Sequence, residues 1–408
     1  FSDFAREIVA YWNRPNDPIP NYLQNAFTHK PFADWYPDPP KWAKVYETLS
    51  CLDGLLEYYR VTGDKHVLEA VTLIRDEIIA SDANLVGSVG FNDIFNHATA
   101  QNSVISEPCD VIHWMRLNYE LFALTADAKY MDTFEDAFLN GFLAGVYRDG
   151  TWGARGVRSH GRHYTAKGQA GMQHNHCCVD NMPRGYMNMA QAIAAEKDGN
   201  LYVSLYSEAS VKIGGLRAEI SPGLIPDGKV AVKVFSPKPA KVFFRIPAWS
   251  RNTFVDGAKA GPGWFEARVE GEKTFALAFD MTPVVVDSKN PETHSTKKDW
   301  TVIRWCSGKE MPVEMYRQTP VATIKCGPIL LARSKLIGST DEEMFKAESI
   351  IGKHAVCRLS PAASDAVDYA WNAEIKTDAG TIRTKVCDYA SGTDDPSYDN
   401  ERFFSLYF

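Results

Sequence analysis

The hydrophobic period of this 408-residue chain changes near residue 200. Before that point, apolar residues such as Val45, Leu49 and Leu52 recur at three- and four-residue spacing, which predicts amphipathic helices. After it, short β-branched or aromatic runs are bounded by Pro, Gly, Asn or Asp, which predicts strands. We therefore expect a helical domain over residues 1–198, followed by one or more β-sandwich domains over 199–408.

The helices are expected in pairs joined by short turns, the arrangement of a helical toroid. They are expected at residues 45–60, 67–80, 111–124, 130–146 and 184–195. Strands are expected at residues 201–206, 230–234, 241–246, 274–279 and 321–324.

Charge and composition exclude several classes of protein. The formal net charge is −7 and no run of Lys or Arg occurs, which argues against a nucleic acid or an anionic membrane as partner. No apolar stretch approaches the roughly 18 residues of a membrane span. Eight cysteines are too few for a disulfide scaffold in a chain of this length.

The placement of four residues suggests a metal site. Glu107 and Cys109 lie two residues apart, and the adjacent pair Cys177 and Cys178 follows later in the helical half. Three thiolates and one carboxylate complete a four-coordinate shell, for which zinc is the first expectation. The spacing matches no zinc-finger pattern, so a packing role for Cys109 and a chance cysteine pair stays open.

Histidines gather in the same half of the chain. Six of the ten are His97, His113, His160, His163, His174 and His176. An isolated histidine is usually a hydrogen-bonded interior or surface residue, but six near the cysteines predict a polar pocket.

The motifs around these residues resemble a known family. The segments 46–64, 107–109 and 176–185 are similar to those of the β-L-arabinofuranosidases of glycoside hydrolase family 127 and the related family 146. The similarity extends to 326–332 and 387–389 near the end. This resemblance implies an (α/α)6 barrel joined to β-sandwich modules.

The resemblance implies roles for the four residues of the metal motif. Glu107, Cys109, Cys177 and Cys178 match the zinc ligands, and Cys177 matches the nucleophile of a retaining mechanism. Metal ligation keeps a cysteine as thiolate at neutral pH. Attack by that thiolate on the anomeric carbon gives a thioglycosyl-enzyme, which water opens in a second step.

The family's acid/base glutamate corresponds here to Asp93, which is a departure. Aspartate is shorter by one methylene, about 1.5 Å, and a misplacement of about 1 Å can cost on the order of 100-fold in rate. We expect either a pocket remodelled for another sugar or a reduced activity. A turn or N-cap role for Asp93 is the alternative.

Further positions are expected to bind the substrate. His97 and His176 adjoin the acid candidate and the nucleophile, and His160 and Glu47 are weaker candidates. Family members carry many more residues ahead of the helix that contains Glu47, so we expect the barrel to be N-terminally incomplete. Such a half-barrel would leave apolar helix faces exposed.

The expected function is that of a zinc-dependent retaining exo-glycosidase. Its expected substrate is a plant-cell-wall oligosaccharide or polysaccharide, from which it releases terminal L-arabinofuranose or a related sugar. The alternatives are an unusual pectin side-chain sugar, or a non-catalytic carbohydrate-binding protein with a structural zinc. A periplasmic or secreted location is expected, with a cytoplasmic one as the alternative, and a homo-oligomer is left open.

Overall fold

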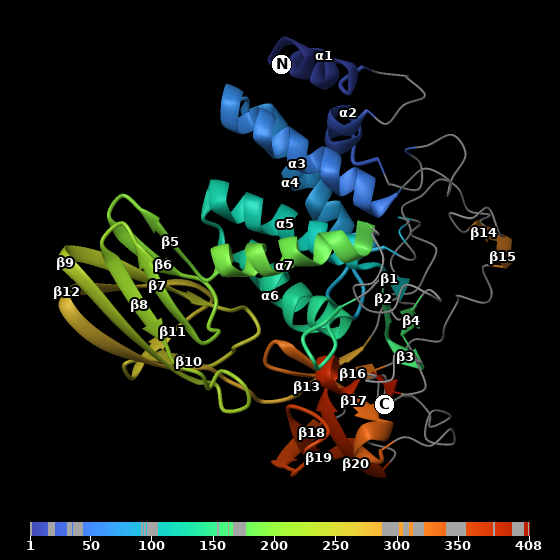
Figure 1. Cartoon of the computed structure of the whole chain (residues 1–408), viewed down its shortest axis with the longest axis vertical. Helices are drawn as coiled ribbons and strands as arrows, with labels where there is room; N and C mark the ends of the chain where they lie inside the picture. The colour runs from blue at the N-terminus through green and yellow to red at the C-terminus, as the bar shows by residue number, and fades with distance from the viewer. Residues whose placement is uncertain are drawn as a thin grey trace.

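A computed structural model of the chain combines a helical part with two large β-sheets (Figure 1). It describes residues 2–14, 21–30, 35, 44–90, 93, 95, 105–152, 155–161, 163–165, 177–287, 302–304, 310–312, 322–339, 356–377, 380–393, 404–406 and 408. The helices gather in the upper part of Figure 1, with the first large sheet at the left and the second below. No helix among the described residues is long and apolar enough to cross a membrane.

The helices and the shorter helical turns carry the following bounds. The α-helices are α1 (Ser2–Tyr11), α2 (Tyr22–Phe27), α3 (Val45–Thr62), α4 (Lys65–Ser81), α5 (Pro108–Thr125), α6 (Ala128–Asp136), α7 (Cys177–Ala192) and α8 (Tyr389–Gly392). A π-helix, η2 (Ala137–Phe142), and two 3₁₀ turns, η3 (Leu143–Gly145) and η5 (Lys335–Ile337), complete the described helical segments.

The two predicted helical hairpins are confirmed, and their turns explain where the helices end. Helix α3 stops at Gly63 in the left-handed conformation, and the Asp64 side chain then caps α4 by accepting a hydrogen bond from the His66 amide. The turn between α5 and α6 is built in the same way: Ala126 adopts the left-handed conformation at the end of α5, and the Asp127 side chain caps α6.

Both bounds of the last predicted helix, residues 184–195, were wrong. Helix α7 begins at Cys177 and continues through Pro183, which lacks the N–H that would bond to the Val179 carbonyl. The Trp152 indole donates to that carbonyl instead, at 2.9 Å. The helix ends at Ala192 because the next residues, Ala194–Lys197, pair with a strand.

Short strands accompany the helical part, and longer strands build the two large sheets. The short strands are β1 (Ile105–Ser106), β2 (Arg155–Arg158), β3 (His160–Gly161) and β4 (Tyr164–Thr165). The first large sheet contains β5 (Ala194–Lys197), β6 (Asn200–Val203), β7 (Ala209–Ile213), β8 (Leu216–Ile220), β9 (Lys229–Ile246), β10 (Thr253–Val255), β11 (Ala258–Ala260) and β12 (Gly263–Ala278). The remaining strands are β13 (Val284–Asp287), β14 (Val302–Arg304), β15 (Glu310–Pro312), β16 (Ala322–Cys326), β17 (Ile329–Ser334), β18 (Val356–Pro361), β19 (Ala370–Thr377), β20 (Gly380–Asp388) and β21 (Phe404–Ser405).

The first large sheet depends on two long strands. β9 and β12 pair antiparallel along most of their length, with an irregularity between Val269 and Gly271. Two strands predicted separately, at 230–234 and 241–246, are therefore parts of the single strand β9. Alternate residues of β9 are buried over much of its length, as the period of 2 requires.

The second large sheet has the strand order β13-β16-β17-β20-β19-β18. Strand β21 pairs with both β17 and β3, and β3 lies in the helical half of the sequence. The end of the described chain therefore ties the second sheet to the segment that precedes α7.

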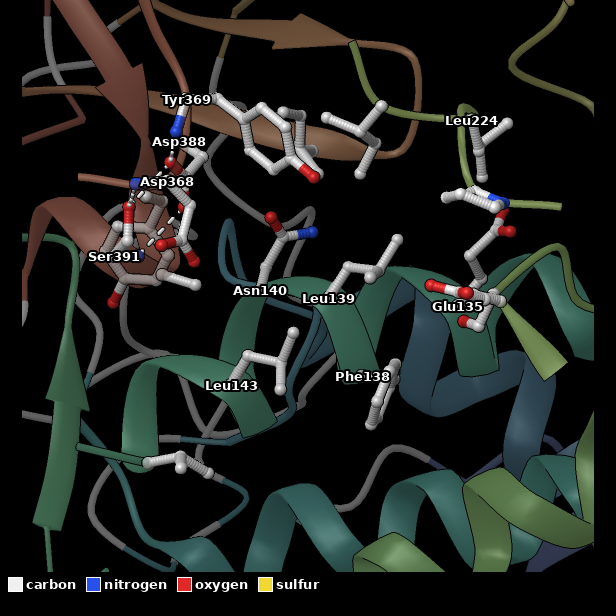
Figure 2. A pocket seen from close by; sticks show the side chains of 18 of the residues that line it. Glu135, Phe138, Leu139, Asn140, Leu143, Leu224, Asp368, Tyr369, Asp388 and Ser391 are labelled. Atoms are coloured by element: carbon white, nitrogen blue, oxygen red, sulfur yellow. Dashed lines mark hydrogen bonds between the residues drawn. The ribbon is translucent and has the colours of Figure 1, made fainter. Parts of the chain in front are cut away.

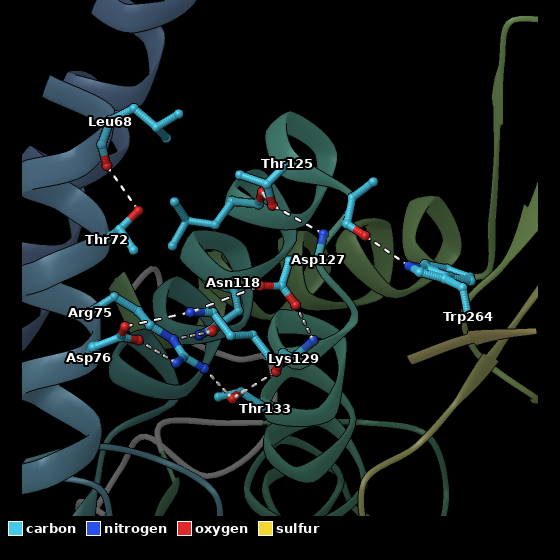
Figure 3. A network of polar contacts seen from close by, with 12 residues as sticks. Leu68, Thr72, Arg75, Asp76, Asn118, Thr125, Asp127, Lys129, Thr133 and Trp264 are labelled. Carbon is cyan, nitrogen blue, oxygen red and sulfur yellow. Dashed lines mark hydrogen bonds and ion pairs between the residues drawn. The ribbon is translucent and has the colours of Figure 1, made fainter. Parts of the chain in front are cut away.

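Figure 3 shows two sets of hydrogen bonds, one that joins helices to one another and one that joins the first large sheet to the helices. The buried Arg75 of α4 donates to Asn118 of α5 at 3.0 Å and also bonds to Thr133 of α6. From the first sheet, the Trp264 indole donates to the Ala126 carbonyl at the α5–α6 turn, at 2.8 Å.

A buried charge cluster also holds the first sheet against α6. Arg245 of β9 is fully buried and forms ion pairs with Asp132 and Glu135, the latter at 2.7 Å. The indole of Trp249 donates to Glu135 at 2.8 Å. Burial raises the pKa of Asp132 to about 6, although the Arg245 charge opposes this shift.

Arg245→Met is expected to lower the free energy of unfolding by about 3–5 kcal/mol, because it leaves buried carboxylates without their cation. Urea unfolding followed by circular dichroism measures the loss. Lys241→Met is the matched control from the same strand, since its pair with Glu266 is exposed and worth less than about 1 kcal/mol. Equal losses in the two variants would show that Arg245 does not hold the interface.

Candidate metal and active site

Two helix N-termini bring the predicted metal motif together. Glu107 is the N-cap of α5 and forms a capping box with Asp110, while Pro108 takes the first helical position. Cys109 follows in the first turn of α5. Cys177 and Cys178 are the first two residues of α7, which packs beside α5 (Figure 1).

The three sulfur atoms form a compact cluster. Sγ of Cys178 lies 3.6 Å from Sγ of Cys109 and 3.9 Å from Sγ of Cys177, and all three atoms lie within 4.8 Å of one another. These separations are too long for a disulfide bond. A tetrahedral zinc ion with Zn–S bonds of about 2.3 Å holds its sulfur ligands about 3.8 Å apart. The cluster therefore has the dimensions and the donor atoms of a site for a thiophilic metal.

Glu107 adjoins the cluster from one side. Its Oε2 atom lies 3.6 Å from Sγ of Cys178. Of the three cysteines, Cys109 and Cys178 are buried and Cys177 is exposed. The predicted ligand set is thus assembled around two enclosed sulfurs and one that solvent can reach.

Without a cation, these thiols cannot all ionise. The hydrogen bond with Cys178 lowers the pKa of Cys109, and the same bond raises the pKa of Cys178. Burial, followed by the charge of Cys109, raises the pKa of Cys177. Several negative charges at this separation repel one another, and a bound cation is the arrangement that would make them compatible.

Asp93 lies against the start of α3. It is buried, its φ is 62°, and its Oδ1 atom accepts a hydrogen bond from the Tyr46 amide at 3.2 Å. Its carbonyl accepts another from the Val45 amide, and its carboxylate pairs with Lys44. Asp93 therefore caps α3 from a distant part of the sequence.

The ring of Tyr46 covers the cluster. It packs against Cys109 and Cys178 and meets the His113 ring edge-on, with 4.7 Å between ring centroids. Since Asp93 holds the Tyr46 amide, the cap of α3 also sets the position of this ring.

Two of the six gathered histidines, which were expected to line a polar pocket, are buried in the protein interior. His113 is 3% exposed and lies between Tyr46 and Asp53, with Nδ1 at 3.4 Å from the Asp53 carboxylate. His163 is also 3% exposed, and its Nδ1 accepts a hydrogen bond from the Arg158 amide.

The other predicted substrate contacts are placed only in part. Glu47 is an exposed residue of α3. His160 belongs to β3, of which the backbone pairing is described. His97 and His176 lie outside the described residues.

Asn181 is a site residue that the sequence motifs did not single out. Its Nδ2 atom donates to Sγ of Cys109 at 3.1 Å, and Asn181 itself is 5% exposed. The available signal was its spacing, since it follows Cys178 by three residues and so shares its helix face.

A separate cavity of about 760 Å³ lies where η2 faces both large sheets (Figure 2). Leu139 and Leu143 line it, together with Tyr369 and Asp388. The Asp388 carboxylate accepts hydrogen bonds from the Tyr369 amide at 3.0 Å and from Ser391. Among the residues that the structure describes, none of the predicted site residues lines this cavity.

Comparison with known proteins supports the family resemblance. Residues 13–191 match a family described as Beta-L-arabinofuranosidase, GH127 catalytic domain. This segment contains α2 to α6, α7 except for its last residue, and all four residues of the predicted metal motif. The resemblance to glycoside hydrolase family 127 is thereby confirmed.

Individual relatives are more distant. The non-reducing end beta-L-arabinofuranosidase of Bifidobacterium longum is 21% identical over 224 residues, which are 50% of this chain and 34% of that protein. A GH127 beta-L-arabinofuranosidase structure from Geobacillus stearothermophilus T6 has a TM-score of 0.63 at 15% identity, covering 89% of this chain and 60% of the other. A second GH127 beta-arabinofuranosidase structure has a TM-score of 0.65 at 16% identity, covering 99% and 68%. These structures support the fold, and the chain spans about a third of the curated relative it matches.

In metal-free, reducing buffer, iodoacetamide is expected to modify Cys177 before Cys109 and Cys178. Access decides the order here, because a buried sulfur cannot be approached even where its pKa is lowered. Peptide mass spectrometry over a time course measures it, with Cys177→Ser as the control that removes the fast site. Faster labelling of Cys109 or Cys178 would contradict the exposure of this site.

Proposed function

We propose that this chain carries the active site of a GH127-type glycoside hydrolase that releases terminal L-arabinofuranose, or a related sugar, from plant-cell-wall glycans. The observation that carries the proposal is the cluster of Cys109, Cys177 and Cys178 within the segment that matches the GH127 catalytic domain. The Bifidobacterium longum relative, a non-reducing end beta-L-arabinofuranosidase, agrees with it.

The bound metal is proposed to be zinc, held by Cys109, Cys177 and Cys178 with Glu107 as the fourth ligand. Sulfur donors favour zinc over magnesium or calcium. The sulfur separations of 3.6 and 3.9 Å fit a tetrahedral site. When bound, zinc would keep the cysteine sulfurs as thiolates at neutral pH.

Cys177 is proposed as the nucleophile of a retaining mechanism. It is the exposed member of the cluster, so a sugar can reach its sulfur. Its Sγ atom would form a bond to the anomeric carbon while the bond from that carbon to the leaving oxygen breaks. A water molecule would then displace the sulfur from the opposite side, and two inversions retain the configuration.

A proton donor is required for the leaving oxygen, and Asp93 is the proposed residue. The same carboxylate would afterwards accept a proton from the attacking water. Its contacts with Lys44 and the Tyr46 amide give it a second, structural role. The two roles predict different consequences of the Asp93→Asn substitution.

The finer architecture and setting are also proposals. We propose that α3 to α7 form part of an (α/α)6 barrel and that the two large sheets belong to β-sandwich modules. His97, His160, His176 and Glu47 remain the proposed substrate contacts. A periplasmic or secreted location would give access to cell-wall glycans, and assembly into a homo-oligomer is compatible with the proposal.

A non-catalytic carbohydrate-binding protein is the second candidate. The observation that favours it is that all four ligands of the cluster could be protein atoms, as in closed structural zinc sites. The exposure of Cys177 favours the enzyme, since a structural ligand has no need of solvent access.

Cys177→Ser is expected to lower hydrolysis of arabinofuranosides by at least about 1,000-fold, because a hydroxyl is a poor nucleophile without a strong base. Initial rates on nitrophenyl glycosides and pectic oligosaccharides measure this. A furanosyl haloacetamide should also label Cys177 in the wild type.

Cys51→Ser is the matched control, because Cys51 is a half-buried residue of α3 outside the sulfur cluster. Its rate is expected to stay within about twofold of the wild type, as for a substitution away from the reacting groups. If Cys177→Ser retained the wild-type rate, the assignment of Cys177 as the nucleophile would be wrong. If the wild type bound glycans without turnover, the second candidate would replace the first.

Asp93→Asn is expected to slow substrates with alcohol leaving groups by about 100-fold or more, and nitrophenyl glycosides much less. A nitrophenolate leaves without protonation, whereas an alkoxide does not. Added azide should restore part of the rate by attacking the glycosyl-enzyme in place of activated water.

Lys44→Met serves as the control, since it removes the ion pair but retains the Asp93 carboxyl. A purely capping role predicts another pattern. Both substrate classes would then slow equally, azide would have no effect, and the loss of stability would match that of Lys44→Met, because an asparagine oxygen caps a helix as well as an aspartate oxygen. That pattern would exclude Asp93 as the proton donor.

A further inference from the structure

We propose that Asn181 is a positioning residue that fixes Cys109 in the metal cluster, and that Arg184 orients its side-chain amide. The inference rests on the proposed metal site and deepens it by assigning two residues beyond the ligands. It starts from the fact that the cluster joins two helices, with Cys109 supplied by α5 and its sulfur partners by α7.

The geometry places Asn181 directly behind Cys109. It lies on α7 one turn after Cys178, so its side chain and the Cys178 sulfur share one helix face. Its Nδ2 atom donates to Sγ of Cys109 at 3.1 Å. Sγ of Cys178 lies 3.6 Å from the same Cys109 sulfur. Helix α7 thus contacts the Cys109 sulfur twice, once through a sulfur and once through an amide.

The direction of the Asn181 amide follows from the chemistry of its other neighbour. Arg184 donates from Nη1 to Oδ1 of Asn181 at 2.9 Å. A guanidinium has only donors, so the amide oxygen must face Arg184 and the amide nitrogen must face the sulfur. Arg184 therefore keeps an N–H directed at Cys109.

An N–H directed at sulfur stabilises negative charge there and restricts the ligand to one position. Both effects favour metal binding, because a thiolate is the form that coordinates. Removal of a residue that hydrogen-bonds to a metal ligand typically lowers metal affinity by about 10–100-fold. We expect an effect of this size for the amide of Asn181.

The test compares Asn181→Leu with the wild-type chain for zinc affinity, measured by competition with a chromophoric chelator. Leucine is close to asparagine in shape but carries no donor, and we expect zinc affinity to fall by about 10–100-fold. Cobalt substitution gives a second readout, since the sulfur-to-cobalt charge-transfer absorption should shift or weaken. A role confined to packing would lower stability without moving that absorption.

Asn188→Leu is the matched control. Asn188 lies on the same helix at 8% exposure, and its Nδ2 atom has no hydrogen-bond partner within the described part of the chain. Its substitution should leave zinc affinity and the cobalt spectrum unchanged. If Asn181→Leu does not fold, Asn181→Asp replaces the donor with an acceptor at nearly equal volume, and its affinity should fall as well.

A double-mutant cycle tests the part played by Arg184. Arg184→Met should weaken zinc binding in the wild-type background and have no further effect in the Asn181→Leu background, because Arg184 acts through the amide. Additive effects would overturn that assignment. Wild-type affinity and an unchanged cobalt spectrum in Asn181→Leu would overturn the inference while the proposed function stands. Failure of the wild-type chain to bind zinc or cobalt would instead remove the proposed metal site as well.

Discussion

The packing of α5 against α7 is the constraint on which the candidate site depends. It brings Cys109 to 3.6 Å from Cys178 across 69 residues of sequence, with Glu107 at the start of one helix and Cys177 at the start of the other. Helix N-termini favour negative charge, so the three cysteine sulfurs, when ionised, and the carboxylate would gain from their placement there. The first turns of two helices thus supply a ligand set that neither helix holds by itself.

The surrounding structure limits how far these helices can move. The buried Arg75 joins α4 to α5 and α6 through hydrogen bonds, and Arg245 anchors the first sheet to α6 through two carboxylates. Trp264 adds a bond from the same sheet to the α5–α6 turn. The first sheet therefore acts on the candidate site indirectly, by fixing α6 and the turn that joins it to α5, which carries Cys109.

Asp93 shows how one residue can serve both the fold and the proposed chemistry. Its carboxylate caps α3, and α3 in turn carries Tyr46 over the sulfur cluster. A substitution at this position would disturb the cover of the metal site even if its proton transfer were unimportant. For this reason the leaving-group dependence, rather than the loss of rate, separates the two roles.

Periodicity was sufficient to predict the helical hairpins and most of the later strands, whereas residue chemistry left a chance cysteine pair open and the family resemblance assigned the four motif residues. The helices and strands could be predicted because their periods depend on local spacing. The contacts of Asn181, the capping role of Asp93 and the fusion of two expected strands into β9 required the tertiary structure. Each depends on which distant segments pack together: the spacing of Asn181 from Cys178 indicates a shared helix face, but not that this face meets the Cys109 sulfur of another helix.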